Sequence, residues 1–226
     1  MGRRKLIHVE DRIIKRVIFY GGKFGIAAIS TKKIASDLRI SEPTIYVHFK
    51  TKENLLKAAY ASIMSATYAT EKKVFEPLIG KREAFQEKFM DILLSLLEAS
   101  KKNKGLVVFA FEYRHSASGD TKGEGTRKES EFMHSFFSSL TKDSDIRLPR
   151  MMEDKIITLA IDTIELYCYE VAVGIEEPTP MTAKIMGSMI LNGTRGIGKL
   201  IESFSEEERK EFDKELTEES GSSNKK

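Results

Sequence analysis

The sequence predicts an all-α protein in which a small helix-turn-helix head is joined through one long helix to a larger helical bundle. Apolar residues recur at helical spacing through most of the 226 residues. Two short helical segments separated by a tight turn lie between residues 30 and 50. No alternating strand pattern of useful length and no internal repeat is present. Together these observations favour helix packed on helix.

The first element is a helix over about residues 8–24, with an apolar stripe that fits the inner face of a three-helix head: Ile13, Ile14, Val17 and Ile18. Gly21 and Gly22 lie near its end. Each glycine weakens a helix by about 1 kcal/mol relative to alanine. The pair therefore predicts a softened helix end. A head of about 50 residues has a small core, so we expect support from the helix that follows it.

Cap residues divide the next stretch into helices. Ser30 or Thr31 can cap a second helix, because a hydroxyl accepts a hydrogen bond from a backbone N–H two or three positions on. Ser41 then caps a third helix, with Pro43 in the first turn, where its missing N–H costs nothing. Thr51 caps the long fourth helix. Two short helices around a tight turn are the layout of a helix-turn-helix DNA reader.

Charge is distributed unevenly along the chain. Residues 1–57 hold 13 Lys and Arg against 5 Asp and Glu, a net charge of +8. The remaining residues hold 24 and 29, a net charge of −5. A basic head on an acidic body is typical of a nucleic-acid binder. The N-terminal Arg3, Arg4 and Lys5 are either a flexible arm that reaches DNA or simply a disordered start.

The segment 42–56 resembles the recognition helix and the following helix start of the tetracycline-repressor (TetR) family of bacterial transcriptional regulators. The similarity runs from about Ile13 to Leu56 in one register without a gap. It includes Gly25, Ser30, Thr31, Ile34, Ala35, Ser41, Thr44, Tyr46, His48, Phe49 and Lys52. Two positions depart from the family: Gly21–Gly22 replaces a bulky apolar residue, and Arg39 stands where the turn usually has glycine. If that turn needs a positive φ, Arg39 is strained by about 1 kcal/mol; otherwise the turn differs slightly.

The resemblance implies roles for the head residues. Tyr46, His48 and Lys52 would contact phosphates, together with Thr31 or Lys32. Base reading would fall to Glu42, Pro43 and Thr44, with Val47 as a further candidate; Thr44 could touch a thymine methyl and Glu42 could accept from cytosine N4. Two alternatives stay open: Glu42 excludes wrong sequences by repulsion, and the His48 ring packs on the helix end and bonds to backbone. The expected DNA-binding set is Thr31, Lys32, Ser41, Glu42, Pro43, Thr44, Tyr46, His48 and Lys52.

The body is expected to be helical throughout. The predicted helices cover about residues 51–76, 82–102, 127–141, 150–174 and 181–203, with a loop over 116–126 and an aromatic stretch over 105–115. Ser205 and Glu208 have the spacing of a capping box, which predicts a short last helix to about residue 216. We therefore divide the chain into a DNA-binding domain (1–50), an effector-binding and dimerisation domain (51–218) and a disordered tail (219–226).

Aromatic and polar residues of the body are candidates for a pocket that holds a small, largely apolar effector. The family places its effector cavity on these helices; the alternative is that aromatic stripes at helical spacing are core. The expected pocket residues are Phe109, Tyr113, His115, Phe132, Phe136, Tyr167 and Cys168.

Glycines inside the last large helix predict a close approach of another helix, since glycine costs helix stability without a packing reason. The family forms a four-helix dimer interface there, so the resemblance implies a homodimer that reads a palindrome with half-sites roughly 34–36 Å apart. The alternative is internal core only. The expected interface residues are Ile164, Val171, Met189, Gly193, Gly196 and Ile197.

Several kinds of chemistry are not indicated. The sequence holds no phosphate-cradling glycine loop, no metal-spaced His/Cys cluster and no arranged catalytic triad, so we expect neither an enzyme nor a cofactor or metal. The lone Cys168 excludes an intrachain disulfide framework and fits a reducing cytoplasm. No apolar run reaches about 18 residues and the charged N-terminus lacks a signal-peptide core, so no membrane span is expected.

The sequence thus predicts a homodimeric transcriptional repressor that binds a palindromic operator on double-stranded DNA and responds to a small molecule. Two alternatives stay open. One is a DNA-binding regulator of the same fold controlled by a protein partner; the other is a helical small-molecule binder with a vestigial head.

Overall fold

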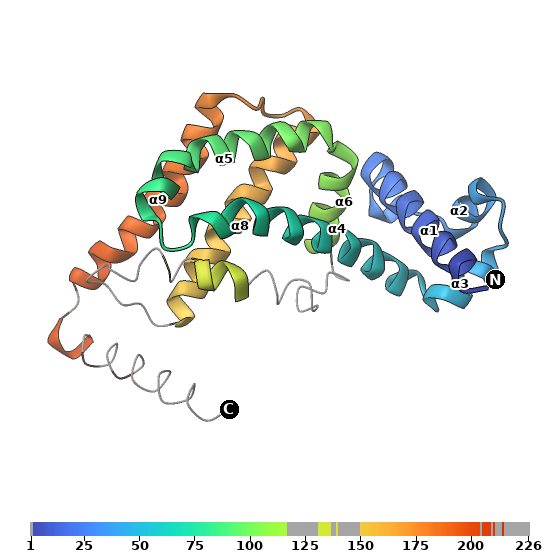
Figure 1. Ribbon diagram of the computed structural model, residues 1–226, viewed down its shortest axis with the longest axis horizontal. Helices are drawn as coiled ribbons and strands as arrows, with labels where there is room; N and C mark the ends of the chain where they lie inside the picture. The colour runs from blue at the N-terminus through green and yellow to red at the C-terminus, as the bar shows by residue number, and fades with distance from the viewer. Residues whose placement is uncertain are drawn as a thin grey trace.

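The computed structural model describes residues 2–116, 131–136, 139, 150–203, 205–208, 210 and 214. These residues form helices and contain no strand, which confirms the all-α prediction. Figure 1 shows an elongated arrangement with the N-terminal head at one end and the body at the other. The long helix α4 (Lys52–Phe75) leaves the head and continues without a break into the body.

The head contains the three helices that the sequence predicts, but the first begins at Gly2 instead of about residue 8, so the backbone of Arg3, Arg4 and Lys5 is helical and not a disordered start. The three helices are α1 (Gly2–Phe24), α2 (Thr31–Leu38) and α3 (Glu42–Phe49), with a short 3-10 turn, η1 (Ile26–Ala28), between the first two. The Ser30 hydroxyl accepts a hydrogen bond from the Lys33 N–H (3.3 Å), and the Thr51 hydroxyl accepts one from the Asn54 N–H (3.0 Å). Both predicted caps are therefore confirmed. Ser41 precedes α3 as expected, but its hydroxyl lies 2.7 Å from the Thr44 hydroxyl instead of bonding a backbone N–H.

The turn between α2 and α3 is left-handed at Arg39, with φ 56° and ψ 44°. The Ile40 N–H donates to the carbonyl of Ala35 (3.0 Å) and the Arg39 N–H donates to that of Ser36 (3.1 Å). This is the usual helix-ending pattern in which glycine is favoured. The turn therefore has the positive φ that glycine usually provides, although Arg39 occupies this position. Of the two predicted possibilities, the structure shows the one in which Arg39 is strained by about 1 kcal/mol.

The core of the head continues into the body. Side chains from α1 to α4 pack around Ile13, Ile34, Ile45 and Leu55, all at most 1 % exposed. The same cluster includes Phe109 and Tyr113 of α6 (Lys104–Arg114). The Tyr113 ring lies 4.8 Å from the Tyr60 ring of α4. The expected support of the small head core thus comes from α6 as well as from α4.

Gly21 and Gly22 mark the place where α1 crosses α6. A Cβ added to Gly22 would lie 2.0 Å from the carbonyl oxygen of Gly105 and 2.4 Å from its Cα. A Cβ added to Gly21 would lie 2.4 Å from the Phe109 ring. The interpretation of these glycines as a softened helix end was therefore incomplete. They let two helix backbones come into direct contact between head and body.

The body is built from α5, α6, α8 and α9, with the far half of α4 running along one side (Figure 1). A short turn, η2 (Glu76–Leu78), leads into α5 (Arg82–Lys102), and the last two large helices are α8 (Arg150–Val173) and α9 (Pro180–Glu202). Helix α5 packs on α8 and α9, and its Leu93 and Leu97 are at most 1 % exposed in a core shared with Met186 of α9. These helix bounds lie within two residues of the predicted ones.

The predicted capping box near the C-terminus is present. The Ser205 N–H donates to a Glu208 carboxylate oxygen (2.7 Å), and the Glu208 N–H donates to the Ser205 hydroxyl (3.3 Å). Helix is also present at residues 131–136, inside the span predicted for a helix over 127–141. The predicted loop over 116–126 beyond its first residue, the connection over 142–149 and the tail over 219–226 lie outside the described residues.

A group of charged side chains lies between α4, α6 and α8. Arg114 donates to Glu165 (2.5 Å) and to Asp162 (2.8 Å). Glu71 of α4 faces Glu165, and each of these two carboxylates has one buried oxygen that meets no hydrogen-bond donor among the described residues. Burial, reinforced by the Glu165 charge, raises the pKa of Glu71 to about 7. Burial also raises the pKa of Glu165, against the opposing effect of Arg114.

Candidate nucleic-acid interface

Helix α3 presents one face to solvent and buries the other. Ile45 and Phe49 are at most 9 % exposed and fix the helix on the head core. Val47 is 66 % exposed and Tyr46 is 38 % exposed. Pro43 is also exposed and lies one turn before Val47. An apolar side chain with this exposure contributes nothing to the head core, so the face is available to contact another molecule.

Three polar side chains join the start of α2 to the start of α3. The Thr31 hydroxyl donates to the Glu42 carboxylate (2.6 Å) and lies 3.2 Å from the Tyr46 hydroxyl. Thr31 is only 7 % exposed. The structure therefore brings Thr31, Glu42 and Tyr46 together as a clamp between the two helices. One acceptor site of Glu42 is already used by this clamp, and Thr31 is poorly placed for a side-chain contact with phosphate.

His48 is held from behind by the first helix. Its Nδ1 lies 2.8 Å from the Glu10 carboxylate, and the side chain is 7 % exposed. The ring also packs beside the Phe49 ring, with centroids 6.2 Å apart. The expected phosphate contact of His48 is not supported by this geometry. The alternative of a ring packed on the helix end fits better, although its partner is a carboxylate and not the backbone.

Three lysines lie close to α3 along the chain, and Lys32 and Lys50 are exposed whereas Lys52 is half-buried. Lys32 lies at the start of α2, and Lys52 is the first residue of α4. Lys50, between α3 and α4, has a positive φ of 67° and donates to the carbonyl of Val47 (3.2 Å). Lys32 and Lys52 are two of the residues for which the sequence predicts phosphate contacts. Sequence reasoning did not single out Lys50, because nothing in a lone lysine indicates its backbone conformation.

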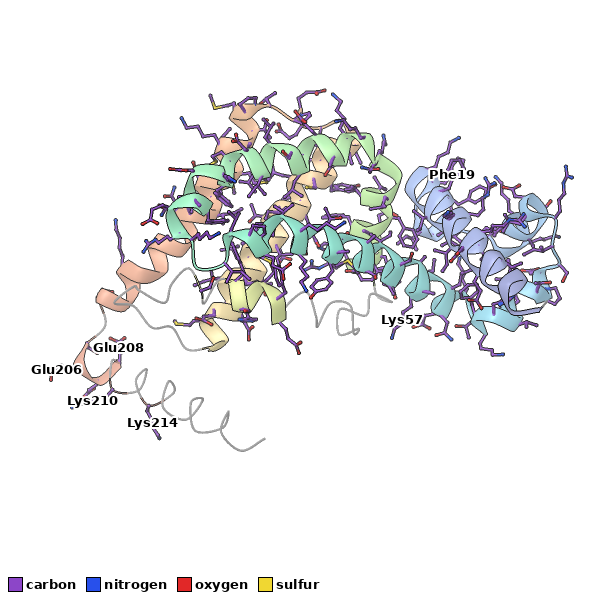
Figure 2. The ribbon with its side chains drawn as sticks, in the orientation of Figure 1. Phe19, Lys57, Glu206, Glu208, Lys210 and Lys214 are labelled. Carbon is purple, nitrogen blue, oxygen red and sulfur yellow. The ribbon has the colours of Figure 1, made fainter. Side chains whose placement is uncertain are left out.

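A second cationic cluster, also not foreseen, covers the outer side of α1. Phe19 and Phe24 are 49 % and 51 % exposed, and Figure 2 shows Phe19 projecting outward from α1. The Lys23 ammonium lies 5.8 Å and 5.2 Å from the centroids of these two rings. The Lys33 ammonium lies 4.9 Å from the Tyr20 ring. Cation–π contacts of this kind hold the lysine heads beside the start of α2.

Comparison with known proteins decides what this head is. Residues 22–59 match the sequence profile described as bacterial regulatory proteins, tetR family. The matched residues include α2, the turn at Arg39, α3 and the first turns of α4. The head is that of a TetR-family regulator. The resemblance inferred from the sequence is thereby confirmed.

Two individual proteins extend the comparison. A TetR-type relative, the uncharacterised HTH-type transcriptional regulator YerO of Bacillus subtilis (strain 168), is 39 % identical over 72 residues. That match covers 32 % of the present chain and a quarter of the length of YerO. The crystal structure of a TetR-like transcriptional regulator from Rhodococcus sp. RHA1 matches with a TM-score of 0.55 at 16 % identity. It covers 83 % of the present chain and 96 % of its own, and shows that the TetR-like fold extends through the body.

The residues expected to line an effector pocket in the body are not gathered in one place. Phe109 and Tyr113 are at most 1 % exposed and belong to the head core. Phe136 packs between Phe75 and Phe85, and Phe132 meets the edge of Tyr68. The Tyr167 hydroxyl donates to the Met189 sulfur (3.4 Å), beside the partly buried Cys168, whose thiol pKa is raised by burial. Among these expected residues, His115 borders an open cleft.

That cleft lies between head and body. It has a volume of about 450 Å³ and is lined by Ile26, Ala27, Phe111, Glu112, His115, Ser116 and Tyr169. The Glu112 carboxylate accepts a hydrogen bond from the Ile26 N–H of η1 (2.8 Å). The Phe111 ring stacks on Tyr169 and lies against His115, each at 4.2 Å between centroids. We call this space the junction cleft.

The expected dimer residues divide into core and surface. Val171 is 2 % exposed and belongs to the body core. Gly187 accommodates Met90 of α5 and Gly193 accommodates Leu159 of α8, so both glycines have packing reasons inside the chain. Ile164 packs partly against the body core. Met189 is 54 % exposed and Gly196 has open space around it, whereas the side chain of Ile197 lies outside the described residues.

Within the part of the chain that the structure describes, no helix combines the length and the hydrophobicity that a membrane span requires. The same residues contain no group of three His, Cys, Asp or Glu side chains placed to hold a metal ion.

Proposed function

We propose that this chain is a DNA-binding transcriptional repressor, not an enzyme, that acts in the cytoplasm as a homodimer on a palindromic operator and responds to a small, largely apolar molecule. The observation that carries the proposal is the exposed face of α3 with Pro43 and Val47, with Lys32, Lys50 and Lys52 close to α3 along the chain. A short helix with its apolar edge bare and cations before and after it in the chain suits the major groove and its phosphates. The match of the head to the TetR family supports the same assignment.

The base-reading part of the proposal falls to Pro43, Thr44 and Val47, and Ser41 stays in the contact set as an exposed residue before α3. The direct test is selection of bound duplexes from a random library, followed by sequencing and a salt titration. We expect a palindrome with two half-sites spaced by about one helical turn of DNA. Weak binding that is independent of sequence would count against a specific regulator.

Lys52→Ala should weaken binding to all duplexes about equally and reduce the salt slope of the binding constant by about one unit, because one phosphate contact is lost. Lys52 begins α4, where a cation opposes the helix dipole, so its removal should not destabilise the fold. Lys88→Ala, at an exposed position on α5 in the body, is the matched control and should leave the slope unchanged. An unchanged slope in Lys52→Ala would remove this residue from the phosphate contacts.

The homodimer is supported by exposed apolar side chains on one face of α9. Met181, Ile185 and Met189 recur at a spacing of four residues and are 64 %, 48 % and 54 % exposed. They form a shallow groove of about 500 Å³ with Lys184, Ser188 and Asn192 at its rim. Leu159 and Leu166 on α8 are also about half exposed. Such a continuous apolar surface favours burial against a second copy.

Ile185→Glu should convert the dimer to a monomer of 25.6 kDa, because a charge at the centre of the groove would be buried without a partner. Sedimentation equilibrium at micromolar protein measures this directly. Phe19→Glu is the matched control, since Phe19 is exposed to the same degree but lies in the head. A dimer that persists in Ile185→Glu would place the interface elsewhere.

A further inference from the structure

We propose that the junction cleft is a ligand site for a planar aromatic cation, such as an aryl amidinium or aryl ammonium compound. The cleft is separate from the packed aromatic clusters of the body interior, and of the expected pocket residues it includes His115. It lies between η1 of the head and α6 and α8 of the body. Its role as an effector site rests on the proposed function, whereas its ability to bind such a compound does not.

The aromatic part of the ligand is indicated by the cleft wall. Tyr169, Phe111 and His115 are in ring contact in that order, with centroid separations of 4.2 Å and interplanar angles of 18° and 30°. Phe111 and Tyr169 are partly exposed and His115 is exposed. Opposite them are Ile26 and Ala27. A flat ring that enters between this stack and the head would meet aromatic surface on one side and aliphatic surface on the other.

The donor character of the ligand is indicated by the polar groups. The Ser116 hydroxyl donates to the carbonyl of Tyr113 (2.8 Å), so its oxygen remains an acceptor. The His115 Nδ1 donates to the carbonyl of Phe111 (2.8 Å), so Nε2 of the neutral ring is also an acceptor. Glu112 supplies carboxylate oxygens. These three side chains at the end of α6 therefore offer acceptors, and a ligand rich in N–H donors complements them.

The positive charge is indicated by Glu112. Among the described residues, no Lys, Arg or His side chain forms an ion pair with this carboxylate. Arg114, which is near in the sequence, instead binds Glu165 and Asp162. The Glu112 carboxylate accepts a hydrogen bond from the neutral Ile26 N–H. A cation beside this carboxylate would gain a charge-assisted hydrogen bond.

The same carboxylate connects ligand and head. Ile26 is the first residue of η1, which leads directly into α2, and Gly25 before it holds a positive φ of 85° beside Glu112. A cation that draws Glu112 toward itself competes with the Ile26 N–H. A bound ligand would therefore loosen this one hydrogen bond between η1 of the head and α6, and we expect it to weaken operator binding.

The experiment titrates the full chain without DNA, using naphthamidine as the cationic probe and the neutral naphthamide of the same ring size as its counterpart, and follows naphthalene fluorescence. We expect saturable binding of naphthamidine at least tenfold tighter than of naphthamide. Glu112→Gln should reduce the preference to below threefold, because it removes the charge but keeps an amide oxygen for the Ile26 N–H. Ala27→Phe, which fills the cleft from the head side, should abolish binding of both probes. Glu98→Gln, at an exposed position on α5, is the matched control and should change nothing.

Equal affinity for the two probes, or unchanged naphthamidine binding in Ala27→Phe, would overturn the proposal. Circular dichroism establishes whether each variant is folded. Glu112→Gln and Ala27→Phe change different atoms of the cleft, so if one variant does not fold, the other still tests the proposal. A separate titration measures the dissociation constant of the selected operator with and without saturating naphthamidine. Failure of the probe titration with intact operator binding would remove the cleft site but keep the regulator. Probe binding without operator binding would keep the site and remove the regulator.

Discussion

Gly22→Ala is expected to lower the free energy of unfolding by about 3 kcal/mol, because the new methyl group has no space. Its Cβ would lie 2.0 Å from the carbonyl oxygen and 2.4 Å from the Cα of Gly105, and both belong to the backbone of α6. Only separation of the two helices relieves this contact. Over-packing of this kind costs about 1–3 kcal/mol and sometimes more, whereas the gain in helix propensity is only about 1 kcal/mol. A thermal unfolding experiment should show a fall in Tm of roughly 5–12 °C.

The contact supplies its own control from the opposite side. A Cβ added to Gly105 would meet only the Cα of Gly22, at 4.0 Å, which is an ordinary van der Waals distance. Gly105→Ala should therefore leave the free energy of unfolding unchanged or raise it by less than about 1 kcal/mol. Equal losses in the two variants would show that neither effect comes from the crossing of α1 and α6.

Glu71→Gln is expected to stabilise the protein above neutral pH by about 2 kcal/mol. Burial beside Glu165 raises the pKa of Glu71 from its ordinary 4.5 to about 7, and one of its oxygens is buried without a donor among the described residues. Each unit of pKa shift corresponds to about 1.4 kcal/mol. The ionised carboxylate therefore costs about 3 kcal/mol, of which a buried amide recovers the larger part.

The direction of the pH dependence follows from this raised pKa. The folded protein holds the Glu71 proton more tightly than the unfolded chain does, so the stabilisation is fully present below about pH 4.5 and is lost as the pH rises through about 7. Urea unfolding between pH 5 and pH 8 should show a steeper loss of stability in the natural protein than in Glu71→Gln. The exposed Glu87→Gln, on α5, should follow the natural protein. Parallel curves for the natural protein and Glu71→Gln would contradict the assignment.

Local sequence patterns were sufficient to predict most of the fold. The caps Ser30 and Thr51 act on their own neighbours, so their side chains alone locate the starts of α2 and α4. The crossing of α1 over α6 was not predicted, because Gly22 and Gly105 are far apart in the sequence and neither indicates its partner. The same limit explains why the glycines of α9 suggested a partner chain, when Gly187 in fact accommodates Met90 of α5.

The candidate site was predicted less completely than the fold. The motif located α3 and its flanking cations, but it could not show that Thr31 is bonded to Glu42 or that His48 is bonded to Glu10. Both bonds join residues on different helices and depend on how the helices pack. For the aromatic residues of the body, the sequence left two roles open, pocket lining and core. The structure places most of them in separate packed clusters.

The shared core of head and body limits how far this protein can be treated as a set of exchangeable modules. Phe109 and Tyr113 fill the interior of the head from α6, and Gly22 fits only against a backbone that approaches as Gly105 does. A chimera that joined residues 1–57 to the body of another family member would leave a hole in the head and a clash or gap beside α1. Grafts between such regulators should therefore be tolerated only when α1 and α6 come from the same parent, wherever the cut in α4 is made.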